Sequence, residues 1–175
     1  MSDDVSVRRV GTHEAGACVE ALADVLIDCV EGGASVGFMR PLPRERALAF
    51  WRGVVDGVAR GERVLLVAED PQGRILGTVQ MIMSLPDNQP HRGDIAKMLV
   101  RRQARRQGIA QRLMTAIDDE ARRERRSVLV LDTVTGGDAE RLYARAGWQR
   151  VGDIPKYALM PDGGFCSTTF FFKHL

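Results

Sequence analysis

The chain has 175 residues, of which 45% are hydrophobic and 27% are charged, and its formal net charge is +2. This composition excludes a disordered chain, and so small a net charge argues against a nucleic-acid-binding protein. The length suits a single domain over residues 1–175, large enough to bury a core without disulfide bonds.

The cysteines and the N-terminus indicate the compartment. Cys18, Cys29 and Cys166 are widely separated, with neither metal-ligand spacing nor a disulfide framework, and the histidines are isolated. No metal site is therefore predicted, and Cys18 and Cys29 are expected as buried thiols. The first ten residues lack the apolar core of a signal peptide, and no apolar run approaches the roughly 18 residues of a membrane span. We expect a cytoplasmic protein that does not bind membranes.

Helix and strand signals alternate through the first half of the chain. Residues 5–10 alternate as a short strand, and apolar residues at spacings of three and four then predict a helix that ends at Gly32-Gly33. The apolar stripe of that helix consists of Cys18, Leu22, Val25, Leu26, Cys29 and Val30. A second helix is expected from Pro41 to Gly61, followed by a hairpin of strands over 64–68 and 74–84.

The loop between the two helices is rich in glycine yet carries apolar side chains. Its sequence from Gly32 to Met39 is GGASVGFM. Such a loop is flexible enough to close over a ligand and apolar enough to touch one. It could equally tuck under the helix that follows.

The second half of the chain repeats strand and helix. Strands are expected over 94–100, 128–134, from Trp148 onward and over 168–173, with helices from Gly108 and over 138–146. An antiparallel meander followed by strand–helix–strand units predicts an α/β (α+β) fold. The expected sheet is mixed and mostly antiparallel, with about seven strands and with helices on both faces.

The turn before the helix at Gly108 is the best candidate for a ligand site. Residues 105–110, RRQGIA, place small side chains and unpaired backbone N–H groups where the helix begins, beside Arg101, Arg102 and Arg112. A helix N-terminus carries about half a positive charge and four free donors, which suits a phosphate or pyrophosphate. An arginine cluster of this kind also fits a solvated face.

This turn resembles the signature Arg/Gln-x-x-Gly-x-Gly/Ala of the GCN5-related N-acetyltransferase (GNAT) superfamily. The strand ending Met98-Leu99-Val100 and the run from Glu140 to Trp148 (ERLYARAGW) are similar to the corresponding parts of that superfamily. The resemblance implies the GNAT fold, acetyl-CoA as the acetyl donor without a metal, and a primary amine as acceptor.

A closer resemblance is to the tabtoxin resistance acetyltransferase, which inactivates a β-lactam amino acid toxin. It rests on Gly32 to Met39, Lys97 to Val100, Leu131-Asp132-Thr133 and Pro161-Asp162-Gly163. This resemblance implies a small-molecule acceptor, such as a toxin or antibiotic like tabtoxinine-β-lactam.

Three side chains are the candidates for catalysis, with roles implied by the resemblance. Asp94, where the tabtoxin resistance enzyme has glutamate, would take a proton from the amine, directly or through a water, or would only orient the substrate. Asp132 would bind the amine or assist the base. Tyr143 would protonate the departing CoA thiolate, since a tyrosine with an ordinary pKa is protonated at pH 7.

The remaining site residues divide between the donor and the acceptor. The backbone of Met98, Leu99 and Val100 would pair with the pantetheine arm, and an N–H group at or near Leu99 would stabilise the charge on the thioester oxygen. The pyrophosphate would lie on Arg105, Arg106, Gln107, Gly108, Ile109, Ala110, Gln111 and Arg112, with Thr133 beside the CoA arm. Ser35, Val36, Phe38 and Met39 would contact the acceptor, together with the segment 154–165.

Three readings of the function remain open on the sequence. The first is an N-acetyltransferase for a small-molecule amine, and the second is the same chemistry on protein or peptide amines or on polyamines. The third is a non-catalytic acyl-CoA sensor, which would not need Asp94, Asp132 and Tyr143 together. A homodimer is expected because dimers are common in the superfamily.

Overall fold

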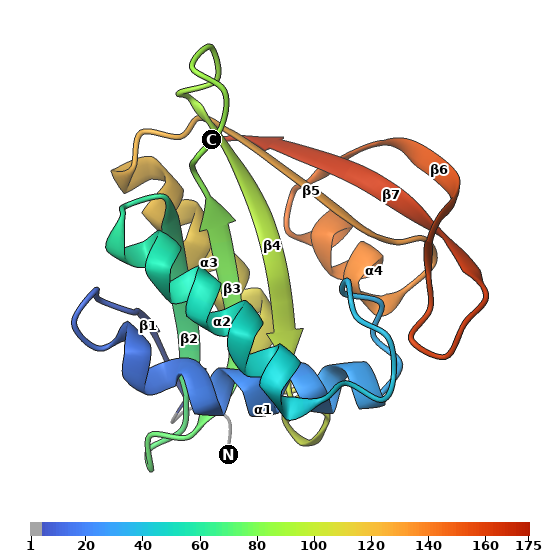
Figure 1. The fold of residues 1–175 in the computed structure, drawn as a ribbon. Coiled ribbons are helices and arrows are strands. Elements are labelled where there is room, and N and C mark those ends of the chain that lie inside the picture. The colour runs from blue at the N-terminus through green and yellow to red at the C-terminus, as the bar shows by residue number, and fades with distance from the viewer. Residues whose placement is uncertain (1–4) are drawn as a thin grey trace.

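The computed structural model describes residues 5–175, which form a twisted seven-stranded sheet with helices on both faces (Figure 1). The strands are β1 (Ser6–Arg9), β2 (Arg63–Glu69), β3 (Ile75–Ile82), β4 (Arg92–Val100), β5 (Val128–Val134), β6 (Gln149–Leu159) and β7 (Phe165–His174). The helices are α1 (Val19–Glu31), α2 (Arg44–Ala59), α3 (Ile109–Arg123) and α4 (Asp138–Arg145), with short 3-10 turns at Ala15–Cys18 and Arg102–Ala104.

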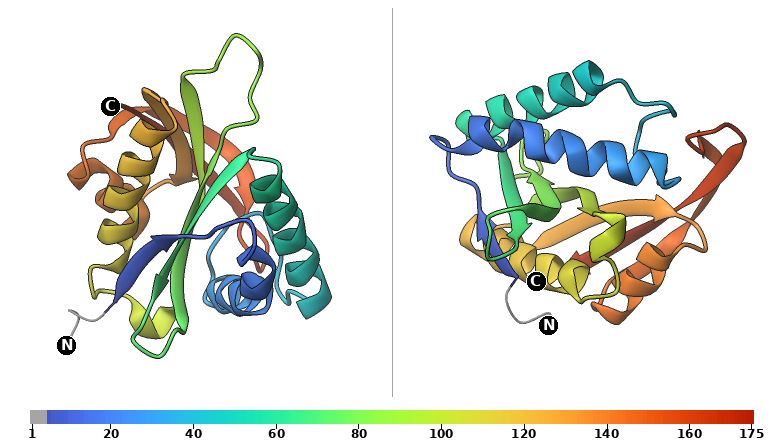
Figure 2. Two further views of the ribbon diagram at one scale, coloured as in Figure 1. Left: turned by 90° about the vertical axis from the view of Figure 1, so that its left-hand side faces the viewer. Right: turned by 90° about the horizontal axis from the view of Figure 1, so that it is seen from below.

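The sheet has the order β1-β2-β3-β4-β5-β7-β6. Every neighbouring pair is antiparallel except β4 and β5, which are parallel and are connected through α3. Figure 2 shows α1 and α2 on one face and α3 and α4 on the other. The predicted fold class, mixed sheet and two-sided helix cover are confirmed.

Two apolar cores lie on opposite sides of the sheet. Leu65 and Val67 of β2 face α1 and α2, where they pack with the fully buried Trp51. Val64 and Leu66 of the same strand face α3. A strand covered on both faces needs apolar residues at every position, which explains the uninterrupted run VLLVA in β2.

Several predicted boundaries move in the structure, and three of these shifts have a clear physical reason. Helix α2 begins at Arg44 rather than at Pro41, because Pro43 has extended backbone angles (φ −63°, ψ 138°) and precedes the first turn. β4 begins at Arg92 because residues 92–94 pair with residues 128–130 of β5. β7 begins at Phe165 because that residue pairs with Leu159 across a hairpin.

The central strands β4 and β5 separate after a short paired segment. Their pairing ends at Asp94 opposite Val130, and Figure 1 shows the two strands diverging from there. β4 also carries a bulge: residues 96–99 lie opposite only residues 78–80 of β3, and Lys97 has a positive φ of 51°. Ala96, Lys97 and Met98 are partly exposed although β4 lies in the middle of the sheet. The region where β4 and β5 diverge, called the splay below, is therefore open to solvent.

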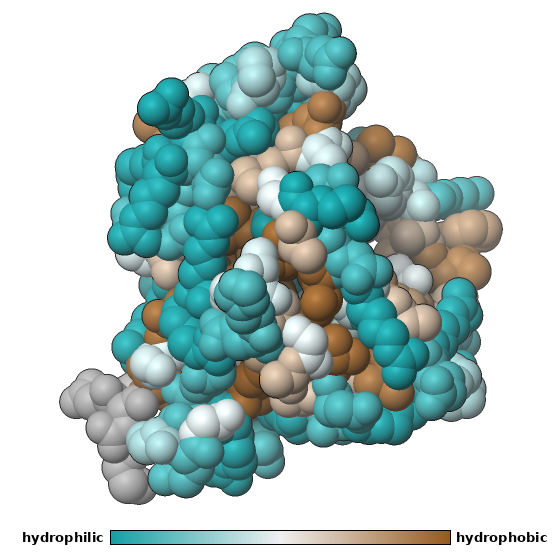
Figure 3. Space-filling view, turned by 60° about the vertical axis from the view of Figure 1, so that its left-hand side comes forward, coloured by the Kyte–Doolittle hydropathy of each residue, from teal (hydrophilic) through white to brown (hydrophobic). Residues whose placement is uncertain are grey.

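The outer surface is mainly polar on the side shown in Figure 3, where hydrophilic residues surround the hydrophobic ones. Within residues 5–175, no helix is both long enough and apolar enough to cross a membrane.

Candidate active site

The N-terminus of α3 opens toward solvent at one end of the splay. Its N-cap Gly108 has the left-handed angles φ 76° and ψ 2°, and no side chain among residues 5–175 caps the helix. The first intrahelical bond runs from the Arg112 N–H to the Gly108 carbonyl at 3.1 Å, and the first turn holds no acidic residue. The N–H groups before it are available to an anion, and a pyrophosphate fits this end of the helix.

The arginine cluster around this turn divides into two sets. Arg101 and Arg102 are held by the protein: the Arg102 Nε lies 3.0 Å from Asp28, and the Arg101 Nε donates to the Ile75 carbonyl at 2.9 Å. The Arg105 Nε donates to the Val100 carbonyl at 3.2 Å. Arg106 is exposed and has a positive φ of 61°. The arginines ahead of residue 105 thus have structural partners, while the loop 105–108 faces solvent.

The far edge of β4 is free for an extended ligand along most of its second half. Beyond Asp94 this edge has no pairing with β5, so backbone groups near Met98 and Leu99 face the splay. Val100 is different, because its carbonyl already accepts from Arg105 and from the Cys29 thiol at 3.4 Å. A pantetheine arm can therefore pair with the backbone before Val100, but not with the Val100 carbonyl.

Asp94 is partly buried beside Arg92, whose guanidinium donates to the Asp94 carboxylate. Burial raises the pKa of Asp94, and the positive charge of Arg92 opposes that shift. Asp94 lies opposite Val130, which points to the same side of β5 as Asp132 two residues further on. The two carboxylates therefore lie on one face of the sheet, the face covered by α1 and α2.

Asp132 is exposed, and its Oδ2 accepts a 2.6 Å hydrogen bond from the hydroxyl of the buried Thr168 on β7. The second oxygen of this carboxylate has no hydrogen bond within residues 5–175 and can accept one from a ligand. The negative charge of Asp132 opposes the lowering of the pKa of Lys97 and adds to the raised pKa of Tyr143. Lys97 lies beside Phe50 of α2 on the same face of the sheet as Asp132, whereas Tyr143 packs into the core on the α3 and α4 face.

Tyr143 is 5% exposed on α4 and packs against the rings of Trp148 and Phe171, each with its centroid 6.1 Å away. Burial raises the pKa of its phenol, and the negative charge of Asp132 raises it further. Tyr143 therefore keeps its proton at neutral pH, as a group that donates one must.

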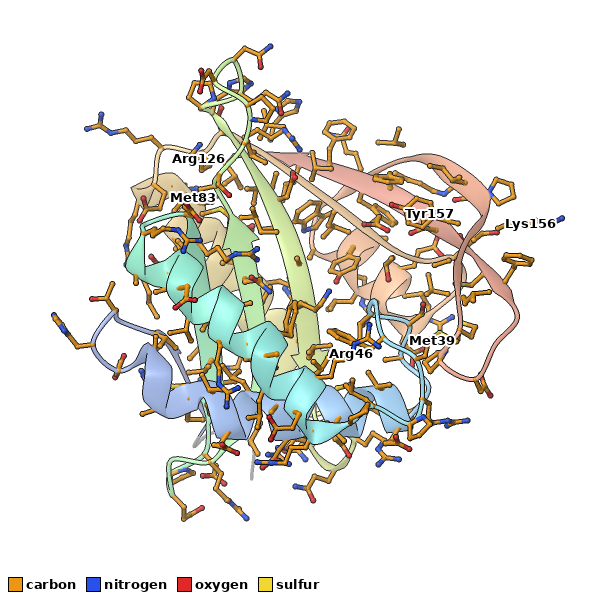
Figure 4. All side chains as sticks on the ribbon, in the orientation of Figure 1. Met39, Arg46, Met83, Arg126, Lys156 and Tyr157 are labelled. Atoms are coloured by element: carbon orange, nitrogen blue, oxygen red, sulfur yellow. The ribbon has the colours of Figure 1, made fainter. Side chains whose placement is uncertain are left out.

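The loop from Gly32 to Pro43 connects the helical layer to the tip of the β6–β7 hairpin. The Ser35 hydroxyl donates to the Leu159 carbonyl at 2.9 Å, and the Arg40 N–H donates to the Pro161 carbonyl at 2.8 Å. Phe38 packs edge-on against Phe50 of α2 at 5.4 Å, and Met39 remains 43% exposed. Figure 4 shows Met39 on this loop, with Arg46 on α2 beside it. The loop packs against α2, as the second expectation has it, and Gly37 lies beside Lys97 at the border of the splay. Contact between this loop and the acceptor stays a prediction.

Lys97 is not among the site residues expected from the sequence. Its ammonium lies 5.4 Å from the centroid of the Phe50 ring, at the border of the splay. Burial lowers the pKa of Lys97, and Asp132 opposes this shift. The signal in the sequence is a single lysine between Ala96 and Met98 in a strand that is otherwise apolar from Ile95 to Val100.

Neither the cysteines nor the acidic residues form a metal site in the part of the chain that is described, where no three such side chains converge. Cys18 and Cys29 are buried, as expected, and Cys166 is partly buried, all three as free thiols.

Comparison with known proteins identifies the family. Residues 60–150 match the acetyltransferase (GNAT) domain family. The chain is 34% identical over 131 residues to an uncharacterized N-acetyltransferase from the hisH–hisA intergenic region of Azospirillum brasilense, covering 74% of this chain and 75% of that protein.

Solved structures share the whole architecture. A GCN5-related N-acetyltransferase from Kribbella flavida is similar over 100% of both chains, with a TM-score of 0.81 and 22% identity. A Salmonella typhimurium protein solved with its cofactor acetyl-CoA is similar over 99% of this chain and 95% of its own, with a TM-score of 0.77 and 19% identity. The family match, the curated relative and this shared architecture agree: the chain belongs to the GNAT family of acetyl-CoA-dependent N-acetyltransferases.

Proposed function

We propose that this chain transfers the acetyl group of acetyl-CoA to the primary amine of a small molecule. The observation that carries the proposal is the connection between loop 32–43 and the β6–β7 hairpin through Ser35 and Arg40. A loop fastened to the hairpin in this way would limit the space for an acceptor beside the splay, which favours a small acceptor over a protein segment. The toxin or antibiotic acceptor suggested by the sequence, such as a β-lactam amino acid, belongs to the same proposal.

The donor would lie along the splay. Its pyrophosphate would contact residues 105–112, and its pantetheine arm would run past the backbone of Met98 and Leu99 toward Thr133. Bound there, acetyl-CoA supplies an activated acetyl group. An N–H group at or near Leu99 would stabilise the oxygen of that group as negative charge develops on it.

The acceptor amine would enter from the face covered by α1 and α2. Asp132 would hold it through the free carboxylate oxygen, and Asp94 would take its proton directly or through one water. The raised pKa of Asp94 makes it a stronger base than an exposed aspartate. Tyr143 would return a proton to the departing thiolate.

We also propose a homodimer and a cytoplasmic location. β6 is an edge strand, and β6 and β7 carry the exposed apolar residues Val151, Ile154, Tyr157, Leu159 and Phe165. Pairing of two β6 strands about a two-fold axis would cover this edge.

The proposed cytoplasmic location is supported by the three free thiols, because cysteines stay reduced in such a compartment.

The proposal is tested by measuring thiol release from acetyl-CoA in the presence of three panels of acceptors: small primary amines, polyamines and peptides with free N-termini. We expect turnover with members of the first panel. Turnover confined to peptides or to polyamines would support the second reading of the sequence, and binding of acetyl-CoA without any thiol release would support a sensor.

A further inference from the structure

The ammonium of Lys97 is a charge in the splay that has no role in the proposed reaction. The bulge of β4 gives Lys97 a positive φ, and its partly buried side chain runs to the border between α2 and loop 32–43. A Cβ atom at Gly37 would lie 3.8 Å from the Lys97 Nζ. Within residues 5–175, no carboxylate forms an ion pair with this ammonium. An ammonium that is partly withdrawn from water and has no anionic partner is a site that favours an anion.

Two further cations lie on the same side of the splay. Arg63 runs beneath α2, where Gly57 makes room for it: a Cβ at Gly57 would come within 2.9 Å of its side chain. The Arg63 Nη1 donates to the buried Gln80 at 2.6 Å, and its charge contributes to the lowered pKa of Lys97. Arg46 lies 5.9 Å from the ring of Phe38, which packs against the same Phe50 ring as Lys97.

The free carboxylate oxygen across the splay from Lys97 belongs to Asp132 on β5, on the face covered by α1 and α2. Asp94 lies on the same face but on β4 itself, where its carboxylate is already paired with Arg92. Asp132 and Lys97 interact electrostatically, yet no hydrogen bond joins them. A cation and an anion that face one region without meeting suit a ligand that carries both charges and fits between them.

We propose that Lys97 binds the carboxylate of an amino acid acceptor whose amine lies toward Asp132, so that the enzyme selects amines that carry a nearby carboxylate. This inference rests on the proposed function and narrows its acceptor to zwitterions. A carboxylate suits the site better than a phosphate does, because one ammonium and one carboxylate on the ligand match one Asp132 and one Lys97. Arg63 and Arg46 support the site through their field and do not contact the ligand.

The test compares acceptors that differ only in the carboxylate. Thiol release from acetyl-CoA is measured with the proteinogenic L-amino acids, with their C-terminal amides and with the corresponding decarboxylated amines. For the best amino acid, we expect a kcat/KM about 10- to 100-fold higher than for its amide, because a charge-assisted contact is lost in the amide.

Two variants make the test specific. Lys97→Gln keeps a polar side chain, one bond shorter than lysine, and the backbone strain of the residue but removes its charge, and it should reduce the preference for acids over amides to about twofold or less. The fall in kcat/KM should be larger for the acids than for the corresponding amides. Arg125→Gln is the matched control, because Arg125 also carries a positive charge and a positive φ, of 57°, but is exposed in the turn between α3 and β5. It should leave the preference unchanged.

Each other outcome contradicts the inference. Equal use of acids, amides and decarboxylated amines by the wild type would show that no carboxylate site exists. A Lys97→Gln variant that melts earlier but keeps the full preference for acids would make Lys97 a packing residue. If no compound in any panel is acetylated, the proposed function fails, and this inference fails with it.

Discussion

Substitution of Gly108 separates the effect of backbone strain on stability from the effect of ligand contacts on acetyl-CoA affinity. Its φ of 76° lies in the left-handed region, and a Cβ placed there has no protein atom within 4 Å. Gly108→Ala therefore meets no clash within residues 5–175 and costs about 1 kcal/mol of stability from its conformation alone. For a chain of this size, that cost lowers Tm by roughly 2–4 °C.

The added methyl group stands where the pyrophosphate would approach the start of α3. Loss of one charge-assisted hydrogen bond costs about 1.5–3 kcal/mol, so acetyl-CoA should bind about 10- to 100-fold more weakly. Isothermal titration calorimetry with acetyl-CoA measures this loss, and thermal unfolding without ligand measures the strain.

The matched control is Gly61→Ala. Gly61 has a φ of 70°, and a Cβ placed there would also have no protein atom within 4 Å. It lies between α2 and β2, close to Arg63. Arg63 pairs with Ile82, at the end of β3 that is remote from Val100. Gly61→Ala should show the same fall in Tm and the affinity of the wild type. Equal affinities in Gly108→Ala and Gly61→Ala would refute the placement of the pyrophosphate at α3.

The remaining predictions concern the reacting groups and the assembly. Tyr143→Phe should lower kcat at least tenfold and leave the acetyl-CoA dissociation constant within about twofold, because the buried ring keeps its packing; an unchanged kcat would remove its role as an acid. Asp94 has a raised pKa in the folded protein, so its protonated form is favoured by folding, and its contribution to stability is lost as pH rises through that pKa. Asp94→Asn should therefore make the unfolding free energy less dependent on pH above about pH 4. Chemical denaturation of the wild type and the variant at several pH values measures this dependence. Identical pH profiles for the two proteins would contradict the raised pKa. The double substitution of Val151 and Tyr157 by glutamate should yield monomers in sedimentation velocity, whereas a dimer that survives it would exclude β6 as the interface.

The order of elements was predictable because it rests on local periodicity. Residues with a three- and four-residue spacing became α1, and the run of apolar residues from 128 to 134 became β5 with the predicted bounds. The boundaries that moved depend on distant partners. β4 gains Arg92 and Gly93 only because β5 lies beside them, a pairing that no local pattern encodes.

The candidate site was predictable where a residue type acts through its backbone or its own chemistry. Gly108 at the start of α3 follows directly from the motif, and its positive φ explains why glycine stands there. The partners of the arginines were not predictable. Arg101 and Arg102 look like Arg105 and Arg106 in the sequence, yet they are held by α1 and β3, more than twenty residues away in the chain.

The environment of Lys97 was likewise not predictable from the sequence. In the sequence it is a single lysine in a strand, for which a solvated position is the simplest interpretation. The bulge, the aromatic ring of Phe50 and the carboxylate of Asp132 give it a different environment, and each comes from a different segment of the chain. Only the assembled sheet shows that these segments share one region.

The central claim is that donor and acceptor meet in the splay and that the acetyl group passes directly between them. Initial rates measured over a grid of acetyl-CoA and amine concentrations test this claim most directly. We predict double-reciprocal lines that intersect, with no acetyl group found on the protein by mass spectrometry after incubation with acetyl-CoA alone. Parallel lines together with an acetylated protein that passes its group to the amine would contradict the claim, because they require a covalent intermediate.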